Sequence, residues 1–145
     1  MQSRLKFFLS SIVTLILIFG TLTPCLAAKN LSALGKVSTQ KKYTMYLGTN
    51  DKDTKKRELQ IKEIQEQMHE ICMQYVDGYT LTVADGYFKD DDGKPYREIS
   101  LVYVFIDTPL ESIQKIMDEA LIKFNQPSIL LEESTGKSVF YSGAK

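Results

Sequence analysis

Glu98, Tyr46 and Ser100 are the residues of this chain whose types and spacing suit acid–base chemistry. Glu98, Ser100 and Val102 alternate along a run rich in β-branched and aromatic residues, so a strand there would place all three on one face. A carboxylate partly removed from water beside Val102 is a candidate general base, and Tyr46 and Ser100 are candidate polar partners that orient a substrate. The alternative interpretation is a cross-strand ion pair between Glu98 or Arg97 and a lysine.

The sequence lacks the patterns of the common metal and cofactor sites. One histidine and two cysteines are too few for a zinc site made of His and Cys alone. The acidic loops around Asp51 and Asp91 do not place oxygen ligands, glycine and glutamate at the spacing of a calcium-binding loop. No phosphate-binding glycine loop, serine-hydrolase elbow or His-Glu-x-x-His motif occurs. We predict no metal ion and no cofactor, and we expect His69 to be a surface residue.

The composition indicates one soluble globular domain rather than a disordered or multi-pass membrane protein. The chain has 145 residues, of which 43% are hydrophobic and 25% are charged. Lysine plus arginine and aspartate plus glutamate both number 18, so the net charge is zero. This balance offers no electrostatic reason to bind nucleic acid or an anionic membrane face.

The N-terminus has the pattern of an export signal. Arg4 and Lys6 precede an uncharged run, Phe7–Ala28, and small residues near its end suit cleavage after Ala27. We predict a signal peptide at residues 1–27 that is removed during export.

Two alternatives to cleavage stay open. The run is close to the about 20 apolar residues that can span a bilayer, so it is also a candidate for an uncleaved anchor. Lipid attachment at Cys25 is a third interpretation, which Pro24 disfavours because the residue before such a cysteine is usually small. In each case the rest of the chain lies outside the cytoplasm, and we expect membrane contact only through this N-terminal segment if it is not cleaved.

Behind the signal, residues 28–41 are polar and are predicted to be a linker, and residues 42–145 are predicted to form the domain. The hydrophobic spacing alternates between two and about 3.6 residues, which predicts strands and helices in turn. Thr108-Pro109-Leu110-Glu111 has the pattern of a capping box, and Asp53 or Thr54 is expected to cap the earlier helix. The expected elements are a strand at Tyr43–Gly48, a helix at Thr54–Tyr75, strands at Tyr79–Phe88 and Tyr96–Ile106, a helix between Thr108 and Asn125, and a strand at Ser128–Glu132, with Ser138–Ser142 as a candidate returning strand.

The order strand, helix, strand, strand, helix, strand predicts an α+β ferredoxin-like fold, the split βαβ sandwich, in which two helices cover one face of an antiparallel sheet. The two middle strands are expected to form a hairpin with Gly93 at a positive φ. That turn sets the register and places Gly86 opposite Glu98 and Thr82 opposite Val102.

The face of the sheet without helices is the predicted binding surface. Val102, Val104 and Ile106 follow one another along it, and a solvated face would not need three apolar residues in a row. We expect this face to be closed by a second subunit, as in a homodimer, or to form a shallow binding cleft. The alternative is that the C-terminal segment folds over it. The predicted binding residues are Thr80, Thr82, Gly86, Val102 and Val104.

Several short motifs resemble an uncharacterised family of small exported bacterial domains, the DUF3574 type. They are Tyr46-Leu47-Gly48, Gly78-Tyr79-Thr80-Leu81, Ala84-Asp85-Gly86-Tyr87, Asp92-Gly93 and Glu98-Ile99-Ser100. The resemblance covers about residues 43–106. It implies a bacterial source, export, and a purpose for Gly86, Glu98 and Ser100, but no activity.

Two functional hypotheses follow from these patterns. The first is an exported binding or interaction module that uses the open face of the sheet. The alternative is a small enzyme of the dimeric α/β-barrel kind with Glu98 as acid or base. A cavity around Glu98 would favour the enzyme, and a flat apolar patch would favour the interaction module.

Overall fold

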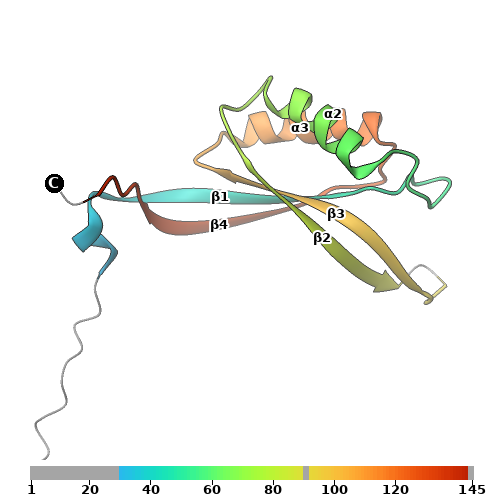
Figure 1. Cartoon of the computed structure of the whole chain (residues 1–145), viewed down its shortest axis with the longest axis horizontal. Coiled ribbons are helices and arrows are strands. Elements are labelled where there is room, and N and C mark those ends of the chain that lie inside the picture. Colours follow the sequence, from blue (N-terminus) through green and yellow to red (C-terminus); the bar gives the residue numbers. More distant parts are fainter. Residues whose placement is uncertain (1–29, 90–91, 144–145) are drawn as a thin grey trace, which may run out of the picture.

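The computed structural model describes residues 30–89 and 92–143 (Figure 1). The predicted signal segment lies outside the described residues. Along the chain the elements are the 3-10 helix η1 Leu31–Leu34, strand β1 Val37–Gly48, helix α2 Ile61–Cys72, strand β2 Thr80–Lys89, strand β3 Pro95–Ile106, helix α3 Leu110–Lys123 and strand β4 Leu130–Val139.

The four strands form one antiparallel sheet in the order β2-β3-β1-β4. Helices α2 and α3 lie on the same side of this sheet, and no helix of the described residues covers its other side (Figure 1). Two strand–helix–strand halves interleave so that β1 and β3 occupy the middle. The predicted ferredoxin-like fold is confirmed.

The core forms where β1 and β3 turn alternate side chains toward the helices. Tyr43, Met45 and Leu47 are buried on β1, while Thr44 and Tyr46 between them are only partly buried. This alternation is the period of two that a half-covered strand shows. The other buried apolar residues are Leu101, Tyr103 and Phe105 of β3, Ile64, Met68, Ile71 and Cys72 of α2, Ile113, Ile116 and Ala120 of α3, and Phe124.

Cys72 behaves as a small hydrophobic residue in this core. It is fully buried and has no disulfide. Burial raises the pKa of its thiol to about 12 because the thiolate would lose its hydration. Cys72 is therefore a packing residue and not a nucleophile.

The hairpin of β2 and β3 has the predicted register. Leu81 pairs with Tyr103 and Gly86 with Glu98, and Gly93 has a φ of 77° as the turn requires. Because the side chains alternate, this pairing places Val102 and Val104 on the uncovered face.

The last strand differs from the prediction. β4 is one continuous strand that pairs with β1 from Tyr46 opposite Leu130 to Val37 opposite Val139. The candidate returning strand at 138–142 was therefore wrong. The reason is that β1 starts at Val37, inside the segment predicted as a linker, and offers β4 a partner well beyond the core.

The helix starts were also predicted too early or with the wrong cap. α2 begins at Ile61 and not at Thr54, since Asp51 Oδ1 accepts the N–H groups of Asp53 and Thr54 at 2.8 and 2.9 Å and turns the chain there. The N-cap of α2 is Gln60, and that of α3 is Pro109; neither makes a side-chain cap hydrogen bond. The helix after Pro109 nevertheless forms because its apolar face is buried.

Neither helix among residues 30–89 and 92–143 has both the length and the hydrophobicity of a membrane span.

The sheet is longer than the helices that cover it. Val37–Lys41 of β1 pair only with β4, and Pro95–Ile99 of β3 pair only with β2. These two-stranded ribbons leave the core in opposite directions (Figure 1). The uncovered face therefore continues at both ends past the helix layer.

Tyr103 is the one buried polar side chain of the described part of the chain whose hydroxyl has no hydrogen-bond partner. The phenol is fully buried beside the ring of Tyr79, at 5.4 Å between centroids. Loss of hydration on burial is the main cause that raises the pKa of Tyr103, and electrostatic interactions with Cys72 and Tyr79 raise this pKa further. The hydroxyl of Tyr79, in contrast, forms a 2.9 Å hydrogen bond with His69 Nδ1.

We predict that Tyr103→Phe stabilises the fold by about 1 kcal/mol at neutral pH, since a buried unpaired hydroxyl has lost its hydration without compensation. The gain should grow above about pH 10, where the unfolded wild-type phenol ionises and the buried one does not. Urea unfolding at several pH values measures both effects. Tyr79→Phe is the matched control, and it should not stabilise because it removes a hydrogen bond. A clear loss of stability in Tyr103→Phe would contradict the prediction.

Candidate functional site

The uncovered side of the sheet, here called the open face, receives side chains from all four strands. Val102 lies between Thr82 and Tyr46 in the sheet, and Tyr46 in turn pairs with Leu130. Val104 lies in the next row, and Ile106 lies opposite Lys42. The exposed fractions of Ile106 and Leu130 are 55% and 59%. The apolar strip of the open face consists of Val102, Val104 and Ile106 of β3, and Leu130 lies on the same face beyond Tyr46.

Glu98 lies at one end of the open face, where β1 ends. Its Oε1 atom accepts the backbone N–H of Asn50 at 2.6 Å. The carboxylate occupies space that the missing side chain of Gly48 leaves free, because a Cβ at that position would be 2.8 Å from Glu98 Oε1 and 2.9 Å from Gln126 Oε1. Gly48 is thus required for the close approach of these two side chains.

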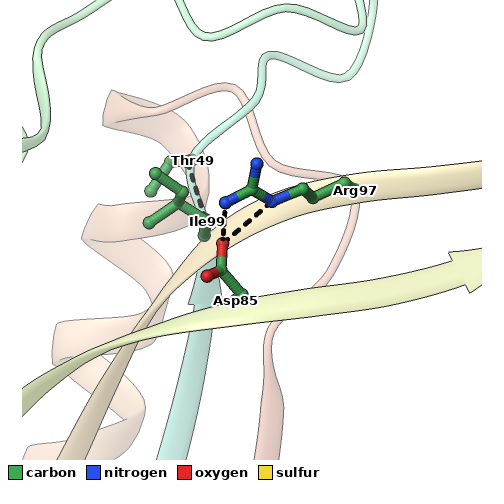
Figure 2. A network of polar contacts seen from close by, with 4 residues as sticks. All are labelled: Thr49, Asp85, Arg97 and Ile99. Atoms are coloured by element: carbon green, nitrogen blue, oxygen red, sulfur yellow. Dashed lines mark hydrogen bonds and ion pairs between the residues drawn. The ribbon is translucent and has the colours of Figure 1, made fainter.

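The segment after β1 is tied to both β3 and the end of α3. Thr49 Oγ1 donates to the carbonyl oxygen of Ile99 at 2.7 Å (Figure 2). The side-chain amide of Asn50 donates to the hydroxyl of Tyr96. Gln126, which is 8% exposed, donates from Nε2 to the Asn50 carbonyl at 2.7 Å and to the Phe124 carbonyl at 3.1 Å. Glu98 therefore belongs to a network that holds this loop in place.

Asn125 forms hydrogen bonds with the same loop at Asp51 and Asp53. Its Nδ2 donates to Asp51 Oδ2 at 2.7 Å and to Asp53 Oδ2 at 2.8 Å. The backbone N–H of Thr54, the Asn125 amide and the backbone N–H of Asp53 lower the pKa of Asp51. These contacts replace the helix cap that the sequence suggested for Asp53 or Thr54.

The three candidate chemical residues do not converge on one point. The hydroxyl of Tyr46 donates to Glu132 Oε2 at 3.0 Å, and this hydrogen bond raises the pKa of Tyr46. Ser100 Oγ lies over Gly86, where a Cβ would be 3.3 Å away. Glu98 instead faces the backbone of Asn50. The predicted binding residues Thr80, Thr82, Gly86, Val102 and Val104 all lie on the open face.

Arg97 pairs on the opposite face of the hairpin, and its partner is an aspartate. Nε and Nη2 donate to Asp85 Oδ1 at 3.0 and 2.7 Å (Figure 2). The guanidinium carbon also lies 5.8 Å from the centre of the Tyr87 ring. All three side chains are exposed, so water screens the pair and it adds little stability. Within the described part of the chain, no salt bridge includes Glu98.

Two surface hollows lie elsewhere on the molecule. One of about 460 Å³ lies between the loop after α2 and the start of α3, with Asp77 and Ser112 in its wall. Another of about 530 Å³ lies between α2 and β2, beside His69. Glu98 lines neither of them. Within residues 30–89 and 92–143, no three His, Cys, Asp or Glu side chains are grouped as a metal site would need.

Sequence reasoning did not identify Asn50 and Gln126, whose hydrogen bonds position the loop at the end of β1. Both flank segments that look like ordinary connections, and their partners are distant in the chain.

Comparison with family models decides the relationship of the chain. The model of one family, described as "Protein of unknown function (DUF3574)", matches residues 42–140. The chain belongs to the DUF3574 family. The match begins at Lys42 inside β1 and ends at the residue after β4, so it includes both α-helices, the other three strands and the second half of β1. The resemblance inferred from the short motifs is confirmed. No match among curated proteins is significant.

One solved structure supports the fold of this DUF3574 domain. A phage SAM lyase in complex with S-methyl-5′-thioadenosine is similar, with a TM-score of 0.52 and 14% identity over 70% of this chain and 90% of that chain. CutA from Synechococcus elongatus has a TM-score of 0.49 and 11% identity over 72% of this chain and 87% of that chain. At such identities the likeness to the SAM lyase shows the fold and no shared activity.

We predict that Gly48→Ala destabilises the domain by about 1–2 kcal/mol, because the new Cβ must push the end of the Glu98 or Gln126 side chain out of its hydrogen bond with Asn50. Urea unfolding measures the loss, and amide hydrogen exchange at Asn50 reports whether the loop opens. Gly136→Ala is the matched control, since this glycine of β4 has no atom within 4 Å of its would-be Cβ. Equal stability of the two variants would contradict the proposed packing.

We also predict different effects for two changes at Glu98. Glu98→Ala removes the acceptor of the Asn50 N–H and should cost about 1–2 kcal/mol. Glu98→Gln keeps an oxygen there and should stay within about 0.5 kcal/mol of wild type. Thermal unfolding of both variants is the measurement. If Glu98→Gln is as damaging as Glu98→Ala, the negative charge and not the hydrogen bond is what the fold requires.

Proposed function

We propose that this domain is an interaction module and that its open face binds a second copy of the chain. The observation that carries the proposal is the apolar strip of Val102, Val104 and Ile106 on a sheet face that neither α2 nor α3 covers, with Leu130 exposed on the same face. Single exposed apolar residues are common on protein surfaces, whereas contiguous ones mark interaction sites.

The area of the open face is close to that of a standard protein interface. Its strands have 12, 10, 12 and 10 residues. At about 3.3 Å per residue and about 4.8 Å between strands, they present roughly 700 Å². A stable protein interface buries on the order of 800 Å² on each partner. The apolar strip lies near the middle of this area, and polar residues such as Thr80 and Glu132 lie around it, as in an interface with a polar rim.

The charges of the open face also suit a two-fold arrangement. Lys42 lies opposite Ile106 at one end, and Glu98 lies at the other end, with Val102 midway between them on β3. A two-fold axis that passes beside Val102 reverses the strand direction between the copies. It therefore brings Lys42 of one copy toward Glu98 of the other and buries the apolar strip against itself.

The surroundings of Glu98 favour an interaction module over the alternative of an enzyme with Glu98 as acid or base. One carboxylate oxygen already accepts a backbone N–H, and the hydroxyl of Tyr46 is bound to Glu132. Together with the export signal predicted at residues 1–27, this supports a module that acts outside the cytoplasm. The proposed binding residues are Thr80, Thr82, Gly86, Val102 and Val104.

The test is chemical cross-linking of the full chain in a Cys25→Ser background. Facing sheets pack about 10 Å apart, so a short bis-maleimide should join two copies through Val102→Cys. The product is a band at twice the 16.5 kDa of the chain. Cys72 should not react, because it is buried and its thiol pKa is raised to about 12.

Two further variants make the test specific. Ile122→Cys lies on α3 with an exposed fraction of 85%, so it should react with maleimide without joining two chains. Ile106→Glu, added to Val102→Cys, should suppress the cross-link because it places a charge in the buried strip. The proposal fails if Val102→Cys gives no dimer, or if Ile122→Cys gives as much of it.

A further inference from the structure

The ribbon of β1 and β4 ends in a cluster of exposed apolar side chains outside the open face. Leu31 and Leu34 of η1 have exposed fractions of 38% and 50%, and Phe140 and Tyr141 after β4 have 89% and 61%. The two segments lie together (Figure 1), since a Cβ on Gly35 would be 3.2 Å from Val139 Cγ2. These four residues, with Lys36 and Lys137, are called the ribbon tip.

The ribbon tip carries positive charge and no negative charge. Lys36 and Lys137 are exposed, and residues 30–42 and 134–145 contain no aspartate or glutamate. The nearest acidic groups lie at the inner end of the ribbon, where Glu133 pairs with Lys41 at 2.8 Å and Asp107 lies 3.5 Å from Gln40. The ribbon tip is therefore locally basic and aromatic, although the net charge of the whole chain is zero.

The tip is also next to the most apolar part of the sequence. Only Lys29 and Asn30 separate Leu31 from the uncharged run Phe7–Ala28. In the alternative in which this run is not cleaved and anchors the chain, the ribbon tip lies only a few residues from the membrane anchor. Phenylalanine, tyrosine and lysine are the residues that favour the boundary between lipid and water.

We propose that the ribbon tip binds the surface of the membrane, with Leu31, Leu34, Phe140 and Tyr141 in the boundary region and Lys36 and Lys137 facing anionic head groups. A bilayer fits better than a second copy, because protein interfaces are depleted of lysine whereas anionic lipid attracts it. The proposal concerns a different surface from the open face and does not depend on self-association there.

The experiment uses the absence of tryptophan from the chain. The full-length Phe140→Trp variant is reconstituted into vesicles of phosphatidylcholine and phosphatidylglycerol whose acyl chains are brominated near the head group. We expect its emission to shift to the blue and to lose most of its intensity relative to vesicles of the same lipids without bromine. Lys36→Glu with Lys137→Glu should restore part of the emission, since the attraction to anionic lipid is lost.

Tyr87→Trp is the matched control, because Tyr87 is 72% exposed on the ribbon of β2 and β3, which projects the other way. Its emission should be the same in both kinds of vesicle. The proposal is overturned if bromine quenches neither variant, or if it quenches both variants to the same extent. It is also overturned if Phe140→Trp shifts to the blue without quenching, because a protein contact would then cover the tip. None of these outcomes bears on the cross-linking through Val102→Cys.

Discussion

β1 and β3 run antiparallel in the middle of the sheet, and their alternate side chains are buried under two helices on one side only. Met45 lies opposite Tyr103, and Leu47 opposite Leu101, all four fully buried. A shift of one residue in this pairing would turn the buried set outward and bring Val102 and Val104 under the helices. The cost of exposing so many large apolar groups fixes the register, and the open face exists because of it.

The polar network at the end of β1 completes the connection between the sheet and the helix layer. Gly48 leaves room for Glu98 and Gln126. Glu98 accepts a hydrogen bond from the backbone N–H of Asn50, and Gln126 donates one to the Asn50 carbonyl. Each bond joins segments far apart in the chain, so the network forms only when the sheet and α3 are already in place. A buried amide such as Gln126 is tolerated there because its nitrogen has two carbonyl partners.

The two proposed surfaces share one geometric origin. α2 and α3 have 12 and 14 residues and span about 18 and about 21 Å, while a strand of 12 residues spans about 40 Å. The helices therefore cover only part of one face, and the sheet continues past them at both ends. What remains uncovered is a face with an apolar strip and a ribbon that carries Phe140 and Tyr141 away from the core.

Much of the fold was determined by the sequence alone, because alternation of apolar residues and a glycine turn act locally. The order of elements, the pairing of Gly86 with Glu98 and the outward direction of Val102 were predicted in this way and are observed. The start of α2, the length of β4 and the partner of Glu98 were decided by tertiary structure. Each depends on a group distant in the chain: Asn125 for the loop that precedes α2, the N-terminal half of β1 for β4, and the Asn50 backbone for Glu98. A local sequence pattern cannot predict such contacts, because they stabilise the fold only once segments that are distant in the chain have come together.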